Sequence, residues 1–398
     1  MARMDVESLR SSASIERVVE ACGVKLKRYG RSVKGCCPFH NEKTPSFTVD
    51  AQRGFFHCFG CGLGGDIFSF VMRSEGVPFP AAVQKVAEIC GLPMPLGGRA
   101  SREAYERHTS LEGVLEEAVR FYKHTLELNQ APRAYMRKRG FSDETLETAQ
   151  IGYAPEGWDA LYNAMRGKGI TGEQLLAVGL VKQRPAGDGY YDIFRQRIMI
   201  PIRNEKGKVV GFAGRHANEV LPDGTPKFIN SPGTELYDKG ATLYLLDRLV
   251  SGPKRSSQPL IVEGYLDALM AMQYGISAVA LGTTRASEKQ ALLLRNYFDN
   301  VIVTLDPDAA GEKATPETSK ELLRVGLGVK VLRLPAGQDL DDLLRSKGGA
   351  HVGELVSSAG SLYDYMHEQA TRGKDLEQLS PEDRVAVLRL ITPFLHNI

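Results

Sequence analysis

Four short apolar runs in the last third of the chain alternate with segments of helical pattern. The runs cover 259–262, 276–281, 301–305 and 329–334; helical segments cover 266–274 and 287–296, and a further one ends near 326. Apolar runs of this length without polar alternation are typical of strands that are buried on both faces. Because they alternate with helices, the pattern predicts a parallel sheet with helices on each side.

Acidic residues directly follow two of these strands. Glu263 comes after the first strand, and Asp306 and Asp308 come after the third. Right-handed crossovers bring the carboxyl ends of parallel strands to one edge of a sheet, so we expect these carboxylates to converge. The acidic segment 339–342 follows the last strand and adds carboxylates at the same edge.

Several acids without a base among them repel one another unless a cation lies between them. Mg²⁺ and Mn²⁺ are hard cations that take oxygen ligands of this kind. We therefore predict a phosphate-handling metal site with ligands from Glu263, Asp306 and Asp308. Further candidate ligands are Asp267, Asp339 and Asp341. The alternative, that each acid caps a helix or lies in a solvated turn, explains less well why acids recur at equivalent strand ends.

A second candidate metal site lies near the N-terminus, where the pairs C-x-x-H and C-x-x-C are separated by 17 residues. These pairs consist of Cys37, His40, Cys58 and Cys61. The intervening segment contains two predicted strands, 46–50 and 54–58, joined by a tight turn. A hairpin that brings two ligand pairs together is the geometry of a zinc ribbon, and a closed Cys₃His site is typical of structural zinc.

The remaining cysteines fit the metal site less well. Cys36 competes with Cys37, but only Cys37 gives the C-x-x-H spacing, and Cys22 and Cys90 are expected to be ordinary small side chains. All six cysteines fall between residues 22 and 90. Clustered cysteines without a secretory context indicate a metal module rather than a disulfide scaffold.

The middle of the chain changes pattern twice. The segment 92–98 is rich in proline and glycine and predicts a linker, and helical segments then run to about residue 180. Around residue 198 apolar and polar positions alternate, so Arg197 and Arg203 share the face opposite the isoleucines. Residues 182–215 carry eight Lys or Arg against three Asp or Glu, which predicts a local basic surface that could hold a phosphate backbone.

Composition sets outer limits on these interpretations. The chain has 398 residues, of which 42% are hydrophobic and 25% charged, as expected for a globular protein of two to three domains. Its net charge is only +2, so a nucleic-acid partner has to be argued from local patches. We find no charged-then-apolar leader and no apolar run near the roughly 18 residues that a membrane span needs. We expect a cytoplasmic protein without a membrane partner.

Longer motifs resemble known families. E-G-Y-L-D at 263–267 followed by D-P-D-A-A-G at 306–311 resembles the Toprim domain of primases, topoisomerases and some nucleases. C-P-F-H-N-E-K-T-P-S-F-T-V, followed by F-H-C-F-G-C-G, resembles the zinc-binding domain of DnaG-type bacterial replicative primases. F-R-Q-R-I-M-I-P-I-R, G-F-A-G-R and P-K-F-I-N-S-P resemble their catalytic core. Together these motifs cover roughly residues 5–350 in the order of that family.

The resemblance implies roles for individual residues. Glu263 would act in acid/base chemistry or metal binding, and Asp306 and Asp308 would hold the divalent metal. Pro307 stands between them where primases more often have glycine, which predicts a stiffer loop. Residues that would grip the template, the incoming nucleotide or both are Arg197, Arg203, Arg215, Lys227, Asn230 and Lys239.

We therefore predict an α/β multidomain fold with a zinc ribbon, a mixed α+β basic subdomain and a Toprim subdomain. The expected bounds are 1–98, 99–258 and 259–350, with a helical remainder at 351–398 in which the helicase-binding domain of the family is expected to be missing. The predicted activity is synthesis of RNA primers on single-stranded DNA from ribonucleoside triphosphates. The expected cofactors are one structural Zn²⁺ and catalytic Mg²⁺ or Mn²⁺, and the expected state is a monomer that does not couple to the replicative helicase.

Four rival functions share parts of this pattern. A Toprim nuclease would use the same acids for cleavage, and a topoisomerase would need a nucleophilic tyrosine in a separate domain; neither explains the zinc ribbon. A non-catalytic recombination mediator also combines zinc with Toprim, but mediators are shorter, use four cysteines and lack the region 195–240. The chain contains no G-x-x-x-x-G-K-[ST] motif, which disfavours a fused primase-helicase.

Overall fold

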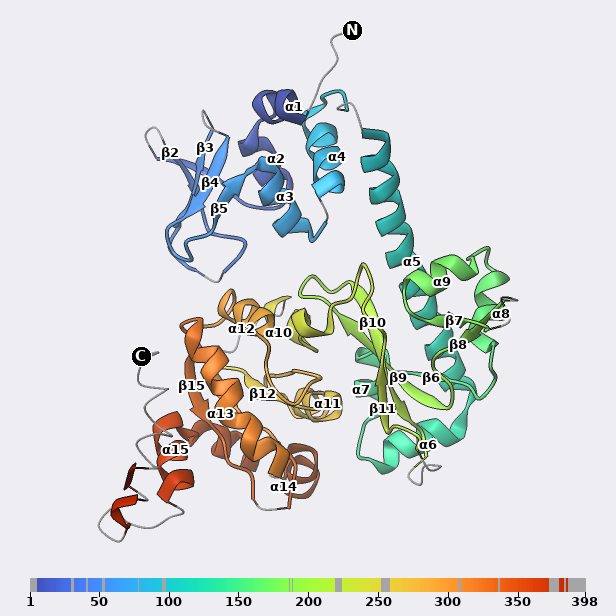
Figure 1. Ribbon diagram of the computed structural model, residues 1–398, viewed down its shortest axis with the longest axis vertical. Helices are drawn as coiled ribbons and strands as arrows, with labels where there is room; N and C mark the ends of the chain where they lie inside the picture. The colour runs from blue at the N-terminus through green and yellow to red at the C-terminus, as the bar shows by residue number, and fades with distance from the viewer. Residues whose placement is uncertain are drawn as a thin grey trace. The chain divides into compact units, whose positions relative to one another are not determined.

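A computed structural model describes most of the chain. The described residues are 6–29, 32–40, 42–51, 54–77, 79–94, 98–185, 187, 189–218, 224–251, 258–306, 309–335, 337–371, 379–382, 384 and 385. The chain forms two compact units, Met1–Ser110 and Leu111–Ile398 (Figure 1). The long helix α5 (Gly98–Leu128) contains the boundary between them.

The first unit is built on a five-stranded antiparallel sheet whose strands follow chain order. Its elements are α1 (Val6–Ser12), α2 (Ile15–Ala21), β1 (Lys27–Tyr29), β2 (Ser32–Gly35), β3 (Phe47–Asp50), β4 (Phe55–Cys58), β5 (Gly64–Asp66), α3 (Ile67–Glu75) and α4 (Phe79–Cys90). The predicted hairpin is confirmed as β3 and β4, whereas the short strands β1, β2 and β5 were not predicted. Ser14 caps α2 and Asp66 caps α3, each accepting a backbone N–H from the first turn.

The first unit has a core of its own. One face of the sheet packs four phenylalanine rings whose centroids lie 5.3 to 6.3 Å apart. These rings belong to Phe39, Phe47, Phe56 and Phe70. Aliphatic side chains of α2, α3 and α4 complete the cluster. A separate core means that loss of the first unit's structure need not unfold the second.

The second unit begins with helices around a four-stranded antiparallel sheet of order β11-β10-β9-β6. Its first elements are α5, α6 (Gln130–Lys138), α7 (Asp143–Thr148), β6 (Gly152–Ala154), α8 (Ala160–Arg166), α9 (Gly172–Ala177), β7 (Val181–Gln183), β8 (Tyr190–Asp192), β9 (Arg197–Arg203), β10 (Val209–His216), β11 (Phe228–Asn230), η1 (Lys239–Ala241) and α10 (Leu246–Ser251). The strand β6 lies inside the region expected to be entirely helical, so that expectation was incomplete.

One expectation about this sheet is wrong. Alternation along β9 predicted one apolar face and one exposed basic face, but six of its seven residues are buried. Ile198 and Ile200 pack into one core, and Met199 on the opposite face packs into another. Because helices cover both faces of this antiparallel sheet, its alternating pattern does not mark a solvent-facing side.

The second unit continues with the predicted alternating strands and helices. These elements are β12 (Leu260–Val262), α11 (Tyr265–Gln273), β13 (Ala278–Ala280), α12 (Glu288–Arg295), β14 (Asn300–Val303), α13 (Ala309–Arg324), β15 (Gly328–Val331), α14 (Leu340–Ser357), β16 (Gly360–Ser361) and α15 (Leu362–Thr371). The sheet order is β13-β12-β14-β15-β16, and the first four strands are parallel. The predicted parallel sheet is confirmed; the antiparallel edge strand β16 was not predicted.

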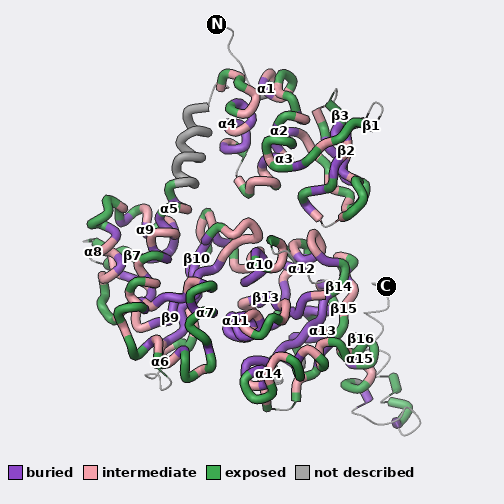
Figure 2. Tube along the Cα trace, turned by 180° about the vertical axis from the view of Figure 1, so that it is seen from behind, coloured by how far each residue is buried: buried purple, intermediate pink, exposed green. Residues whose placement is uncertain are grey.

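Helices cover both faces of the parallel sheet. Side chains of α11 and α14 pack on Leu260 and Val262, and side chains of α12 and α13 pack on Ile261 from the other side. In Figure 2 the strand β13 and most of β14 are coloured as buried. The first of these cores also includes Ile198 and Ile200 of β9, so the two sheets share a core and are held as one compact unit.

Candidate metal centres and nucleic-acid groove

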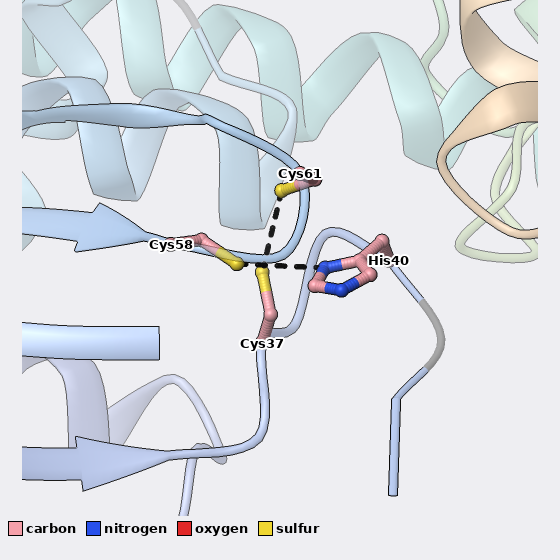
Figure 3. A group of neighbouring side chains, drawn as sticks. All are labelled: Cys37, His40, Cys58 and Cys61. Atoms are coloured by element: carbon pink, nitrogen blue, oxygen red, sulfur yellow. Dashed lines mark hydrogen bonds between the residues drawn. The ribbon is translucent and has the colours of Figure 1, made fainter. Parts of the chain in front are cut away.

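The structure brings the four predicted zinc ligands of the first unit together (Figure 3). Cys37 Sγ lies 4.0 Å from Cys61 Sγ, and Cys58 Sγ lies 3.7 Å from His40 Nδ1. All four donor atoms lie within 4.8 Å of one another. Cys37 and His40 follow β2, and the two other ligands flank the turn after β4, so the folded sheet itself brings the two pairs together.

This donor set fits zinc. A tetrahedral ion with Zn–S distances of about 2.3 Å and Zn–N distances of about 2.0 Å separates its ligand atoms by roughly 3.5 to 3.8 Å. The two measured separations, 3.7 and 4.0 Å, require only a small contraction. Burial raises the pKa of the Cys37 thiol, so that this group needs a cation to be held as thiolate.

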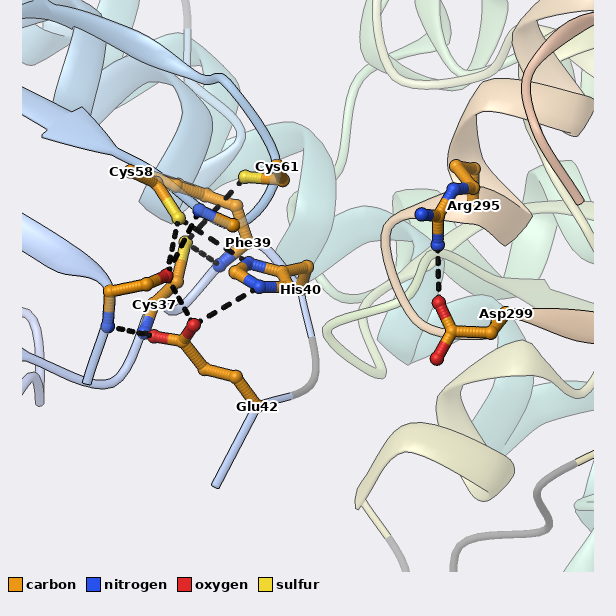
Figure 4. A network of polar contacts seen from close by, with 10 residues as sticks. Cys37, Phe39, His40, Glu42, Cys58, Cys61, Arg295 and Asp299 are labelled. Carbon is orange, nitrogen blue, oxygen red and sulfur yellow. Dashed lines mark hydrogen bonds and ion pairs between the residues drawn. The ribbon is translucent and has the colours of Figure 1, made fainter. Parts of the chain in front are cut away.

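A polar network surrounds the cluster (Figure 4). The Glu42 carboxylate accepts hydrogen bonds from the backbone N–H groups of Cys37 and Ser46, and its Oε2 lies 3.2 Å from His40 Nε2. The Ser46 hydroxyl lies 3.1 Å from Cys58 Sγ. Gly60 is required here, because a Cβ on it would come within 2.6 Å of His40 Nε2. Cys36, by contrast, is exposed.

The acidic edge of the parallel sheet forms as predicted from the strand order. Ile261 pairs with Val303, so the ends of β12 and β14 that carry Glu263 and Asp306 lie at the same edge. The Glu263 carbonyl accepts from the Gly282 N–H after β13, which fixes the turn into α11. Gly264 leaves room for the Asp267 carboxylate, because a Cβ on it would lie 2.3 Å from Asp267 Oδ2. Pro307 and Asp308 lie outside the described residues.

The electrostatics of this edge indicate a cation site. Burial, together with the charges of Asp306, Asp339 and Asp341, raises the pKa of Asp267 to about 8. Carboxylates this close together are oxygen donors whose mutual repulsion a divalent cation removes. The donor chemistry therefore fits Mg²⁺ or Mn²⁺.

Two of the further candidate ligands have other contacts. Asp339 caps α14 by accepting the Asp342 N–H at 2.7 Å. Asp341 is buried, and its Oδ2 accepts from Arg139 at 2.6 Å, while Arg345 lies 3.4 Å from its Oδ1. A carboxylate that two guanidinium groups already neutralise is a poorer metal ligand, so Asp341 is better described as a link between α6 and α14.

The basic residues predicted to grip nucleic acid are more buried than expected. Arg197 is 5% exposed, and its guanidinium donates to the carbonyls of Gly214, Pro226 and Lys227 at 2.9 to 3.3 Å. Arg203 donates to the Gly207 carbonyl and forms an ion pair with Glu116 at 3.3 Å. The expectation that these two arginines project from an exposed face is therefore wrong.

Of the other four predicted contacts, two are bonded within the protein and two are lysines that are more open to solvent. Arg215 is buried, donates to the Tyr135 hydroxyl at 2.8 Å and lies over the Phe228 ring. Asn230 accepts from the Tyr265 hydroxyl at 2.8 Å, so it links β11 to the first turn of α11. Lys227 is exposed and Lys239 is half-buried. Of the six residues, Lys227 is thus the one most open to a phosphate.

The structure identifies a groove that sequence reasoning missed. It has a volume of about 460 Å³ and is lined by Trp158, Arg195, Arg197 and His216 together with the segment 224–226. Trp158 is 58% exposed, and the Arg195 guanidinium lies 4.0 Å from the centroid of its ring. An exposed indole with a stacked cation presents a flat surface and a positive charge, the combination on which single-stranded nucleic acid binds.

Two aromatic residues of the first unit are open to solvent. Phe55 and Phe59 are 51% and 74% exposed. Phe55 and His57 point to the solvent side of β4, and the Phe59 ring packs edge-on against His57. Lys34 lies on the same face of the sheet as His57, because both residues pair with Thr48 on the strand between them. Alternation in β4 could have shown this, since Phe56 and Cys58 fill the buried positions.

Comparison with known proteins agrees with this arrangement. Residues 1–101 match the CHC2 zinc finger family, 121–250 match the DNA primase catalytic core N-terminal domain, and 260–344 match the Toprim-like family. The DNA primase of Escherichia coli (strain K12) is 34% identical over the whole of this chain, which covers 68% of that protein. The chain belongs to the bacterial DNA primase family. The predicted family and fold class are thereby confirmed.

Other primases extend the comparison. The DNA primase of Deinococcus radiodurans is 36% identical over 94% of this chain, and that of Haemophilus influenzae is 35% identical over 99%. The chain spans 64% and 66% of the lengths of these two proteins, less than two thirds of each.

Solved primase structures match as well. The Aquifex aeolicus primase, comprising zinc-binding and RNA polymerase domains, aligns with a TM-score of 0.64 at 29% identity, covering 100% of this chain and 94% of that one. A DnaG primase catalytic domain bound to single-stranded DNA aligns with a TM-score of 0.64 at 30% identity, covering 74% of this chain and 94% of that one. Among the helices described for this chain, none combines the length and apolar character needed to cross a bilayer.

Proposed function

We propose that this chain synthesises short RNA primers on single-stranded DNA from ribonucleoside triphosphates, by phosphoryl transfer that divalent metal ions assist. The observation that carries the proposal is the acidic edge of the parallel sheet, where the ends of β12 and β14 present Glu263 and Asp306 beside the buried Asp267. Its DNA and nucleotide substrates would be met in the cytoplasm. The alternative of a non-catalytic mediator is less well supported, because residues 121–250 match a primase catalytic core.

In this proposal the acidic residues hold the metal ions and orient the reacting groups. Glu263, Asp306 and Asp308 supply carboxylate oxygens, with Asp267 and Asp339 as further candidates. When bound, the ions polarise the α-phosphate, lower the pKa of the primer 3′-hydroxyl and neutralise the leaving pyrophosphate. Asp341 positions α14 through Arg139 rather than binding metal. Cys37, His40, Cys58 and Cys61 hold a structural zinc ion in the first unit.

A short path connects the groove to the acidic edge. The segment leading into β11 lines the groove at Thr225 and Pro226, and β11 ends at Asn230. Asn230 accepts from Tyr265, which is the first residue of α11 and lies two residues after Glu263. The segment that lines the groove is therefore linked through β11 to the turn that carries Glu263, so a template strand in the groove would be held in a defined place relative to the acidic edge. A related primase catalytic domain has been solved bound to single-stranded DNA, which supports single-stranded DNA as the ligand of this chain.

Each part of the groove has a task in template binding. Trp158 would stack on a base, Arg195 and Lys227, which directly follows the lining segment, would contact phosphates, and Arg197 would hold the groove wall through its three carbonyl contacts. In the first unit, Phe55, Phe59 and Lys34 offer a similar combination of exposed rings and positive charge. Stacking tolerates any base sequence, whereas phosphate contacts make binding dependent on salt.

Two variants of the groove should weaken binding in different ways. Trp158→Ala should lower single-stranded DNA affinity about tenfold, because stacking contributes ~1–3 kcal/mol per base. It should leave the salt dependence unchanged. Arg195→Ala should lower the affinity too, and unlike Trp158→Ala it should reduce the slope of log affinity against log salt by roughly 0.7, the value for one lost phosphate contact. Fluorescence anisotropy of labelled oligonucleotides across a salt series measures both.

The matched control is Arg166→Ala. Arg166 also stacks on an aromatic ring, that of Tyr162 at 5.7 Å, but neither residue lines the groove. Its loss should leave both affinity and slope unchanged. If both groove variants bind like the parent chain, or if the control weakens binding as much as they do, the groove is not the template site.

The nature of the product separates the proposed activity from cleavage. With unlabelled ribonucleotides and Mg²⁺, an end-labelled single-stranded DNA should keep its length throughout the incubation. Progressive shortening of that DNA would instead indicate that the acidic edge belongs to a nuclease.

A further inference from the structure

Glu42 is a nearly buried carboxylate with a contact on every side. Its side chain is 10% exposed. Oε1 accepts from the backbone N–H groups of Cys37 at 2.7 Å and Ser46 at 3.0 Å. Oε2 accepts from the Ser46 hydroxyl and lies 3.2 Å from His40 Nε2. A buried anion with this many partners holds the groups around it in defined places.

The two nitrogens of His40 face different partners. Nδ1 lies 3.7 Å from Cys58 Sγ, on the side of the sulfur cluster, and Nε2 lies on the side of Glu42 (Figures 3 and 4). A neutral imidazole carries one N–H and one lone pair, and only the lone pair can bind a metal. A carboxylate at Nε2 attracts the proton there and leaves the lone pair on Nδ1.

The same carboxylate also reaches both halves of the cluster. One of its backbone donors is the N–H of Cys37, a ligand of the first pair. Its other partner, Ser46, contacts Cys58 Sγ at 3.1 Å and accepts from the Gly60 N–H at 3.1 Å, which places it at the second pair. Glu42 therefore connects the two ligand pairs as well as orienting the histidine.

From this geometry we infer that Glu42 is a positioning residue for the zinc site. It fixes His40 in the tautomer that presents Nδ1 to the metal, and it holds the two ligand pairs in place relative to each other. The inference rests on the proposed zinc site and adds to it a carboxylate that does not touch the ion.

A glutamine at position 42 separates the two tasks. Because two backbone N–H groups donate to Oε1, the amide oxygen of Glu42→Gln would take that place. Its NH₂ group would then face His40 Nε2. A donor at Nε2 favours the tautomer with the proton on Nδ1, which removes the lone pair from the metal side. Glutamine thus keeps the contacts with the backbone N–H groups but favours the opposite tautomer of His40.

The test is the zinc affinity of the full chain, measured by competition with a chelating dye. Glu42→Gln should bind zinc about 10- to 100-fold more weakly than the parent chain, the usual effect of losing a partner of a metal-bound histidine. Asp66→Asn is the matched control, since Asp66 also accepts a backbone N–H, from Ser69 at 2.7 Å, but contacts no ligand. It should retain the parent affinity within about threefold, or ~0.65 kcal/mol.

A direct readout of the tautomer accompanies the titration. In the zinc-loaded parent chain with ¹⁵N-labelled histidine, His40 should carry its proton on Nε2. A proton on Nδ1, or a Glu42→Gln variant that binds zinc as tightly as the parent, would overturn the role of Glu42 while leaving the zinc site intact. Absence of zinc binding by the parent chain would overturn both.

Discussion

Asp306→Asn should lower the rate of primer synthesis at least 100-fold, a barrier increase of about 2.7 kcal/mol. Asp306 follows β14 at the edge where its charge already acts on Asp267. The substitution keeps the size of the side chain but removes an anionic oxygen that the metal ions need. Because it also removes repulsion among neighbouring acids, the thermal stability of the chain should not fall.

Asp299→Asn controls for the change of charge. Asp299 directly precedes β14, at the opposite end of the same strand, and its ion pair with Arg295 lies at the surface. Exposed pairs of this kind contribute little to stability, so the variant should synthesise primers at the parent rate. If Asp306→Asn retains activity within about threefold, a change of only ~0.65 kcal/mol, Asp306 is not a metal ligand.

Cys61→Ala should release the zinc ion and unfold the first unit. Structural zinc sites contribute about 10–16 kcal/mol of apparent binding free energy, and a small antiparallel sheet cannot readily replace this amount. The second unit has its own cores and should remain folded. Metal analysis of the purified protein measures the zinc, and hydrogen exchange resolved by peptide shows which unit has lost protection.

Cys36→Ala is the control for zinc loss. Cys36 is the immediate neighbour of Cys37, but it is exposed and outside the cluster. This variant should retain one zinc ion and a protected first unit. Full zinc content in Cys61→Ala, or zinc loss in Cys36→Ala, would show that the ligand set is assigned incorrectly.

The sequence predicted best those features that depend on local pattern alone. Apolar strands ending on acids lead directly to the edge that carries Glu263 and Asp306, because strand direction and crossover handedness decide where strand ends lie. The C-x-x-H and C-x-x-C pairs likewise predict a shared cluster, since the hairpin between them brings the two pairs together. Neither the acidic edge nor the zinc cluster depends on how the helices pack, so both can be predicted before the tertiary structure is known.

Tertiary packing explains what the sequence could not show. The Arg197 guanidinium donates to the carbonyls of Pro226 and Lys227, which come from a distant part of the chain, so its burial could not be predicted locally. The groove likewise combines Trp158 with Arg195, which lie far apart in sequence. Glu42 carried a weak local signal, a carboxylate two residues after a histidine ligand. Its importance becomes evident only from four contacts that the fold assembles.

The most direct test of the central claim is an assay of RNA synthesis on a single-stranded DNA template to which no primer has been annealed. Unprimed single-stranded DNA, α-labelled ribonucleoside triphosphates and Mg²⁺ are incubated with the parent chain, and the products are separated on a denaturing gel. The proposal predicts short labelled products that alkali destroys, and that do not form when the DNA is omitted, when the metal is chelated, or with Asp306→Asn. No labelled product from the parent chain, or a product that forms without DNA, would contradict it.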